Sequence, residues 1–311
     1  FNSGNGITKT DQFGMILWRK FFFYIVSSMY INMTSDNQNL VCFGYNSISL
    51  SDTSGNRIWS HTFNDTHYIS YHINEFIQIN NGLIFSGIKE TPGGYSGFLW
   101  KYDLNGNLMW QKTYNAMQII NSIAVNSDLT FLTVGLKNYF MFTAKYDIYG
   151  NQLWEKNYIE DSLRSGNSIK KAGNNRFVIA SNNNKFQGKC LIIDSTGNIV
   201  SSIDHEYGLN DWVDYRNVIS VSDSGFVFTG IIEFDENGPV DWIVVKTDKY
   251  GNATPIGIET VSSQVPDQLK LYQNYPNPFN PETKIRFEIP ANRIMFSANI
   301  RFYVYDITGR V

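Results

Sequence analysis

The residue types that could perform acid–base or metal chemistry are few in this chain and lie far apart. Among its four histidines, His67 and His72 share one short segment, where two imidazoles could bind an ion together. On a strand, their spacing of five residues would place them on opposite faces, so we expect no shared metal. Asp204, His205 and Glu206 have the groups needed for acid–base catalysis, but three consecutive side chains cannot all face one pocket. We therefore predict a solvated loop there.

Two other kinds of residue could bind a ligand at the surface. The acidic run 235–237 with Asp241 could hold a calcium ion, although a plain acidic loop is the simpler interpretation. Aromatic side chains such as Tyr95, Tyr139 and Trp212 could stack on sugar rings, but we expect each of them to pack in the core. The sequence has no Gly-x-Ser-x-Gly motif, no His-Glu-x-x-His and no phosphate-binding glycine-rich loop. We predict no catalytic residue, metal site or cofactor, and whether the protein is an enzyme stays open, with the pattern favouring a non-enzyme.

A repeated stretch defines the elements that would have to position such residues. Residues 101–112 read KYDLNGNLMWQK, and residues 145–156 read KYDIYGNQLWEK. The residues that recur are Asp103, Gly106 and Trp110 in one copy, and Asp147, Gly150 and Trp154 in the other. Weaker Asp-x-x-Gly copies begin at residues 11, 52, 194 and 248, so successive copies are 41, 51, 44, 47 and 54 residues apart. A period in the forties is typical of propellers and solenoids.

The repeated residues are typical of a hairpin turn and of packing rather than of catalysis. Asp at the first turn position accepts hydrogen bonds from nearby backbone N–H groups. Gly three residues later tolerates the positive φ of a type I turn closed by a G1 bulge. We interpret the Trp that follows in the first four copies as a packing residue between blades. Because each copy lies in a different blade, the aspartates cannot converge on one calcium ion.

Each period also contains short apolar runs separated by polar turns, such as Leu83–Gly87 and Phe98–Tyr102. Four short strands per period correspond to one propeller blade. We therefore predict an all-β fold, with a β-propeller over residues 1–256 that has about six to eight four-stranded blades. The copies present here fill five blades and a half, so we expect the sequence to be a fragment that begins within a blade.

Composition agrees with many short strands packed through large side chains, since 15% of the residues are aromatic and only 17% are charged. The net charge is −3 and the basic residues are scattered, which argues against a nucleic-acid or anionic-membrane surface. The apolar run 21–26 is too short to span a membrane, and no signal peptide is recognisable. Cys42 and Cys190 lie on predicted strands in distant blades, so we expect two buried thiols and no disulfide.

The character of the sequence changes after Gly251. Residues 257–270 have the composition of a linker, and residues 271–311 form a separate segment. Three prolines within residues 276–281 remove backbone donors and favour extended conformations. Residues 284–290 then alternate apolar and charged side chains, which predicts a strand of a second, small β domain.

This last segment resembles the start of the C-terminal sorting domain of type IX secretion substrates. The resemblance rests on residues 304–310 and on the motif Tyr275, Pro276, Asn277, Pro278, Phe279, Asn280 and Pro281. It implies an immunoglobulin-like β-sandwich that the outer-membrane translocon recognises and that is usually removed on release or attachment. It also implies a secreted protein or one displayed on the outer-membrane surface. The final segment of that family is expected beyond residue 311, so the domain is predicted to be truncated here.

Residues 1–256 are similar to bacterial propeller-like repeat proteins whose units read roughly Asp-Gly-Gly-Phe and then Lys-Thr-Asp-x-x-Gly-Asn-x-x-Trp. The unit at residues 222–252 matches best and departs from the pattern at Pro255, where Trp is expected. The resemblance implies a fold and a location, but no reaction.

The sequence thus predicts an exported β-propeller that binds an extracellular glycan or protein without catalysis. Its expected partners are the type IX translocon, through the C-terminal segment, and that extracellular ligand. The alternative is an accessory or catalytic module of an extracellular hydrolase or lyase. A structural surface protein with no small ligand is a third possibility.

Overall fold

The structure is a computed structural model in which the chain divides into two compact units, residues 1–254 and 255–311. The residues that the structure describes are 5–22, 29–63, 69–116, 118–159, 163–173, 175–183, 187–205, 212–233, 240–253, 270–275, 277–278 and 283–288.

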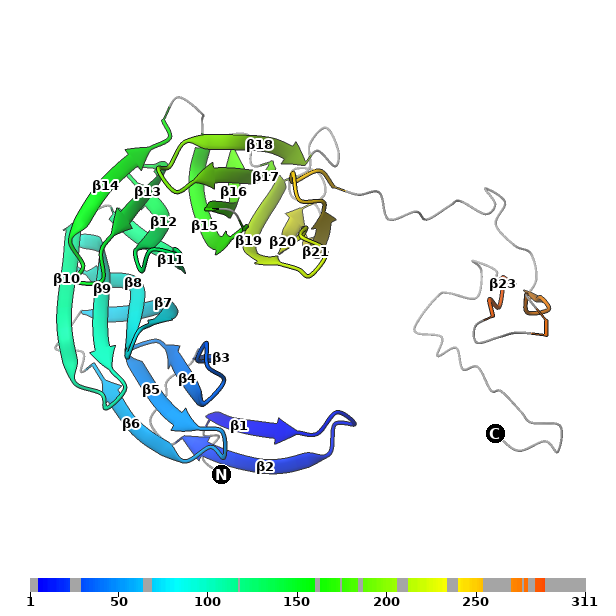
Figure 1. The fold of residues 1–311 in the computed structure, drawn as a ribbon, viewed down its shortest axis with the longest axis horizontal. Helices are drawn as coiled ribbons and strands as arrows, with labels where there is room; N and C mark the ends of the chain where they lie inside the picture. The colour runs from blue at the N-terminus through cyan, green and yellow to red at the C-terminus, as the bar shows by residue number, and fades with distance from the viewer. Residues whose placement is uncertain are drawn as a thin grey trace. The chain divides into compact units, whose positions relative to one another are not determined.

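The first unit consists of consecutive antiparallel sheets arranged around a common centre (Figure 1). It starts with a hairpin of β1 (Asn5–Thr10) and β2 (Ile16–Phe22). Four blades of four strands follow in chain order, and a parallel pair between Ser96 and Gln118 links the second of them to the third. Their strands are β3 (Met29–Met33), β4 (Asn39–Gly44), β5 (Ser47–Asp52), β6 (Arg57–Thr62); β7 (Ser70–Ile79), β8 (Gly82–Thr91), β9 (Gly94–Asp103), β10 (Leu108–Ala116); β11 (Gln118–Val125), β12 (Phe131–Lys137), β13 (Phe140–Tyr146), β14 (Gln152–Asn157); β15 (Leu163–Lys171), β16 (Arg176–Asn183), β17 (Gly188–Asp194) and β18 (Ile199–His205).

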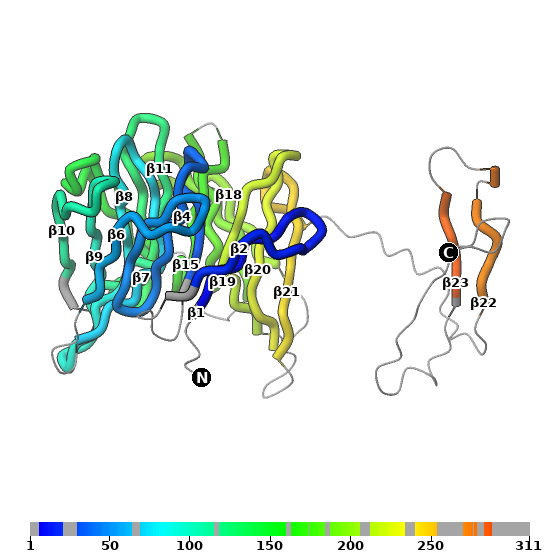
Figure 2. Tube along the Cα trace, turned by 90° about the horizontal axis from the view of Figure 1, so that it is seen from below, coloured from blue at the N-terminus to red at the C-terminus, as the bar shows by residue number. Residues whose placement is uncertain are grey.

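A further blade contains β19 (Trp212–Ser220), β20 (Phe226–Glu233) and β21 (Val240–Thr247), and its chain continues into a bridge between Thr247 and Ala253. In every blade the first strand lies innermost and the last lies outermost (Figure 1), and the blades stand side by side with their strands roughly parallel to the central axis (Figure 2). The predicted all-β propeller is therefore confirmed, and the apolar runs Leu83–Gly87 and Phe98–Tyr102 lie within β8 and β9 as predicted.

The apolar core lies between neighbouring blades. One cluster joins Val41 and Leu50 of one blade to Phe85 and Trp100 of the next, and three more clusters repeat this arrangement along the chain. Because both faces of a blade are covered by neighbours, its middle strands are buried almost without interruption, as in β17. Cys42 and Cys190 are buried and unpaired, as predicted.

The described part of the second unit is a short antiparallel ladder. Here β22 (Lys270–Leu271) pairs with β23 (Phe287–Glu288), and the backbones of Tyr275 and Lys284 exchange hydrogen bonds of 3.0 and 2.9 Å. Of the strand predicted at residues 284–290, the described part contains the bridge at Lys284 and the two strand residues Phe287–Glu288. Of the sorting motif, Pro276 and residues 279–281 lie outside the described residues. Among the described residues there is no apolar helix of membrane-spanning length.

Candidate functional site

His205, the histidine singled out for acid–base chemistry, is a buried structural residue. It ends β18, and its Nε2 donates to the carbonyl oxygen of Gly251 at 2.9 Å. Because that oxygen can only accept, Nδ1 is left to accept from the Tyr215 hydroxyl at 2.7 Å. Burial lowers the pKa of His205 below its ordinary value. The predicted solvated loop is therefore wrong for this residue, because the side chain fills the space between two blades; Glu206 lies outside the described residues.

The other candidate residues do not converge. His72 lies on β7 rather than in a connecting segment, and its imidazole stacks edge-on against Tyr45, while His67 lies outside the described residues. Asp241 is exposed on β21, and residues 235–237 fall outside the described set. Within the described part of the chain, no three potential metal ligands cluster together.

Two of the aromatic residues expected in the core are on the surface. The side chains of Tyr95 and Tyr139 are 49% and 70% exposed, so the expectation of core packing was wrong for both. Both lie at or next to the turn between the second and third strands of a blade, where no neighbouring blade covers them. Trp212 is half-buried at the start of β19.

The repeated aspartates close the outer hairpin of their blades. The backbone N–H of Gly106 donates to the Asp103 carbonyl at 3.1 Å, and the N–H of Asp103 donates to the Asn107 carbonyl at 2.9 Å. The Asp103 carboxylate also accepts from the side chain of Asn107 at 2.8 Å, and this bond, with the backbone N–H of the same residue, lowers the pKa of Asp103. Asp147 makes the same bonds to Asn151. These carboxylates are occupied within their own turns.

The repeated Gly and Trp lock neighbouring blades together. The Nε1 of Trp59 donates to the carbonyl oxygen of Leu104 at 3.0 Å, and a Cβ added at Gly106 would lie 2.7 Å from the Trp59 ring. Gly106 thus lies on the tryptophan of the preceding blade. The same contact joins Gly55 to Trp18, Gly150 to Trp110 and Gly197 to Trp154.

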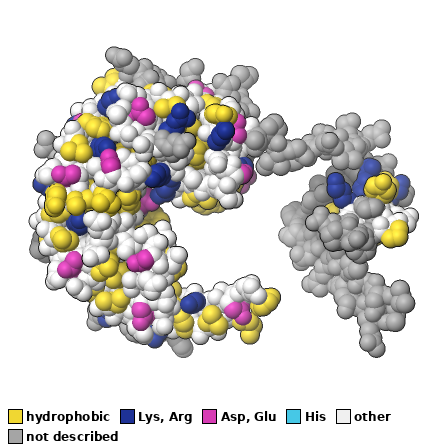
Figure 3. All heavy atoms as spheres, in the orientation of Figure 1, with side chains coloured by type: hydrophobic (Ala, Val, Ile, Leu, Met, Phe, Trp, Pro, Cys, Tyr) yellow, Lys and Arg dark blue, Asp and Glu magenta, His cyan; other side chains and the backbone are white. Residues whose placement is uncertain are grey.

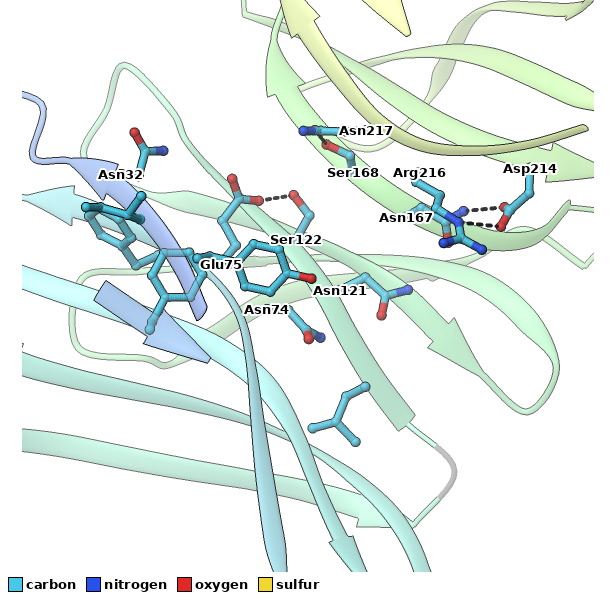
Figure 4. A pocket seen from close by; sticks show the side chains of 15 residues that line it. Asn32, Asn74, Glu75, Asn121, Ser122, Asn167, Ser168, Asp214, Arg216 and Asn217 are labelled. Carbon is cyan, nitrogen blue, oxygen red and sulfur yellow. Dashed lines mark hydrogen bonds and ion pairs between the residues drawn. The ribbon is translucent and has the colours of Figure 1, made fainter. Parts of the chain in front are cut away.

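The cavity that remains as a candidate site lies where the innermost strands of five blades converge. It has a volume of about 660 Å³, and β3, β7, β11, β15 and β19 all contribute to its wall (Figure 4). Its polar residues are Asn32, Asn74, Glu75, Asn121, Ser122, Asn167, Ser168, Asp214, Arg216 and Asn217.

A row of asparagine amides runs around this cavity from blade to blade. Asn74 donates through Nδ2 to the carbonyl oxygen of Ile120 at 2.9 Å, Asn121 donates to that of Gly166 at 3.0 Å, and Asn167 donates to that of Tyr215 at 2.7 Å. Each asparagine lies at a register shift of its strand, where a bulge turns the side chain sideways towards the next blade. At the corresponding position of β19, the chain has Arg216.

Both carboxylates in the cavity wall are held by other side chains. Glu75 forms an ion pair with Lys170, which reaches it from two blades away. Glu75 also accepts a hydrogen bond from the Ser122 hydroxyl (Figure 4). Asp214 pairs with Arg216 at 3.3 Å and accepts from the amide of Asn167 at 3.0 Å. Neither carboxylate is therefore available as an unpartnered acid or base, whereas the wall as a whole offers many hydrogen-bonding groups.

Sequence reasoning missed these residues, although one signal was present. Asn74, Asn121 and Asn167 follow one another at nearly one blade period, just before the apolar positions of the innermost strands. The Asp-x-x-Gly pattern of the outer turn is much stronger than this period of single asparagines on the inner strands, and it therefore dominates the repeat.

No family model matches the sequence, and no curated protein matches it. Among solved structures, hydrazine synthase of Kuenenia stuttgartiensis is similar, with a TM-score of 0.56 and 10% identity, over 72% of this chain and 65% of that one. The Pan2 WD40 domain of Neurospora crassa is similar, with a TM-score of 0.51 and 15% identity, over 70% of this chain and 61% of that one. The chain thus spans less than two thirds of either structure. At these identities the likeness shows the fold alone, an all-β propeller.

Proposed function

We propose that this protein is a secreted or outer-membrane-surface β-propeller that binds a glycan or a protein without altering it chemically. The observation that carries the proposal is the cavity among the innermost strands, which is rich in amides and hydroxyls while its carboxylates are already paired. Pockets with a few convergent polar groups are the usual places for ligand binding.

The alternative, a hydrolase or lyase module, requires groups that can exchange protons with a substrate. A glycosidase, for example, uses two carboxyl groups, one of which must be available as an acid and the other as a base or nucleophile. The oxygens of Glu75 accept from Lys170 and Ser122, and those of Asp214 accept from other amides and from Arg216. This arrangement favours binding over catalysis.

Export through a type IX-like system is the second part of the proposal. It is supported by the resemblance of residues 271–281 and 304–310 to the sorting domain of that system's substrates. The segment would act as the contact to the translocon, and an immunoglobulin-like sandwich is the fold that the resemblance implies.

The binding function is tested with the purified chain on arrays of oligosaccharides and extracellular proteins, with parallel assays of product formation. We expect retention of at least one class of ligand and no turnover. Turnover of any polysaccharide or peptide by the purified chain would contradict the proposal and support the hydrolase or lyase alternative.

Export is tested by fractionating the bacterium that encodes the protein and locating it with an antibody. We expect the protein in the medium or the outer membrane, and its retention in the periplasm when the type IX translocon is inactivated. An unchanged location in the translocon mutant would remove this part of the proposal and leave the binding function unaffected.

A further inference from the structure

We propose that the cavity lined by the innermost strands is a binding site for an uncharged oligosaccharide. The inference rests on the proposed binding function and specifies its ligand. It draws on four properties of the wall, which are fixed hydrogen-bond acceptors, available donors, balanced charge and one exposed aromatic face.

The acceptors are fixed because the hydrogen bonds between blades determine which way the asparagine amides point. The carbonyl oxygens of Ile120 and Gly166 can only accept, so the groups facing them at 2.9 and 3.0 Å must be the Nδ2 atoms of Asn74 and Asn121. The Oδ1 atoms of these two asparagines are then left as acceptors on the cavity wall. A ligand that satisfies them has to bring donors, as sugar hydroxyl groups do.

Donors are present on the same wall. Asn32 uses its Oδ1 to accept from the backbone of Met33 at 2.8 Å, so its Nδ2 is left to donate. Arg216 uses its Nε for Asp214, and its side chain is 58% exposed, so the terminal N–H groups of its guanidinium reach solvent. A wall that both donates and accepts fits hydroxyl groups, because each hydroxyl can do both.

The charges of the cavity cancel in pairs. Glu75 is opposed by Lys170, and Asp214 is opposed by Arg216. A site for an acidic sugar or a polyanion would be expected to carry an excess of positive charge. Because each cation here faces a carboxylate, the ligand that fits is uncharged. Charges of both signs are also interspersed over the outer surface that Figure 3 shows.

Tyr30 supplies the aromatic face. Its side chain is 59% exposed and contributes to the cavity wall, while its ring stacks on that of Phe43 with 5.6 Å between the ring centroids. Phe43 is buried and therefore supports the ring from beneath. An exposed ring next to polar groups suits the apolar C–H face of a sugar, which lies flat on it while the hydroxyls reach the amides. The volume of about 660 Å³ lies within the range of natural ligand pockets.

The experiment compares three classes of probe on the purified full chain by calorimetry and on arrays. The probes are neutral oligosaccharides of glucose, mannose and galactose, acidic oligogalacturonates and heparin fragments, and a peptide library. Two variants remove ligand contacts without touching the hydrogen bonds between blades, namely Tyr30→Ala and Asn32→Ala. The matched control is Tyr149→Ala, which removes an exposed tyrosine outside the cavity. Thermal melting of each variant verifies that it is folded.

We expect a neutral oligosaccharide to bind, with affinity reduced about tenfold or more in Tyr30→Ala and reduced in Asn32→Ala, and unchanged in Tyr149→Ala. Preferential binding of acidic glycans or peptides would overturn this inference and leave the broader binding function standing. The same holds if a neutral glycan binds folded Tyr30→Ala and Asn32→Ala as tightly as the unmodified chain. If no probe of any class binds, the inference and the proposed binding function both fall.

Discussion

At the scale of single residues, the turn glycine meets two separate requirements. Gly106 has a φ of +88°, which side-chain-bearing residues rarely adopt. It also lies against the Trp59 ring, so that even one added carbon would be too close. The first requirement comes from the hairpin itself, and the second comes from the neighbouring blade.

Two alanine substitutions separate these requirements. Gly173 has a φ of +74° in another hairpin and has no atom within 4 Å of an added Cβ. Gly173→Ala should therefore lower the unfolding free energy only through backbone strain, by about 1–2 kcal/mol. Gly106→Ala should lower the unfolding free energy by about 1–3 kcal/mol more than this, because its added carbon also overpacks the interface between blades. Urea denaturation of both variants measures the difference. Equal losses of unfolding free energy would show that the tryptophan contact does not restrain this position.

At the scale of elements, the outermost strand of a blade uses a bulge to aim its tryptophan. In β6 the pairing with β5 shifts between the partners of Leu50 and Ser51, which leaves Ile58 as an extra residue just before Trp59. Ile58 is 51% exposed, whereas Trp59 is half-buried beneath the next blade. The equivalent shift stands before Trp18, Trp110 and Trp154. An extra residue at this point therefore decides which of two adjacent apolar side chains packs.

Because Trp59 packs and Ile58 is exposed, substitutions at these two neighbouring residues should affect stability very differently. Trp59→Phe removes the donor to the Leu104 carbonyl and part of the ring under Gly106, so it should lower the unfolding free energy by about 1–3 kcal/mol. Ile58→Ser changes an exposed bulge residue and should stay within about 0.5 kcal/mol of the unmodified protein. Calorimetric melting of the two variants tests the assignment, and a larger loss for Ile58→Ser would refute it.

At the scale of the whole molecule, some of the hydrogen bonds that hold the blades and their turns depend on protonation. His205 links β18 to the carbonyl oxygen of Gly251 in the neighbouring blade, and burial keeps its pKa low. The turn carboxylates Asp52 and Asp103 have pKa values below the ordinary 3.8 because hydrogen bonds stabilise their charged forms. Acidification should therefore loosen the propeller in two steps.

The lowered pKa values of His205 and Asp103 both make the folded state less stable in acid. A depressed pKa means that the folded state holds its proton less tightly than the unfolded state, so the contribution is complete above the ordinary pKa and is lost as the pH falls through the folded one. Stability should first decline as the pH falls below 6.5, the ordinary value for His205, and decline again below 3.8. Melting curves across pH 3–8 measure both steps. His205→Gln should abolish the first decline in stability and leave the second. If the variant keeps the same dependence of stability on pH, the first decline does not come from His205.

The fold could be predicted from the sequence because its strongest signals are local. An Asp-x-x-Gly-Asn hairpin closes with bonds between residues at most four apart, as the Asp103 turn shows, so a single copy reveals its own geometry. Once the turns are placed, the alternation of apolar and polar residues between them predicts each strand and the side chains that it buries. The sequence also predicts that the repeated Trp packs between blades. It does not indicate that the Trp packs on the turn glycine of the next blade.

The candidate site could not be predicted in the same way, because its residues meet only after the blades are assembled. Lys170 and Glu75 are 95 residues apart, so no local pattern in the sequence connects them. His205 illustrates the converse: its neighbours in sequence are charged, which suggested a solvated loop, yet its neighbours in space are Tyr215 and Gly251. The sequence by itself determined the blades, since their turns and strands are fixed by short-range hydrogen bonds and alternation. Only the tertiary structure decided the cavity, since its wall takes one or a few side chains from each of five strands that converge around an axis.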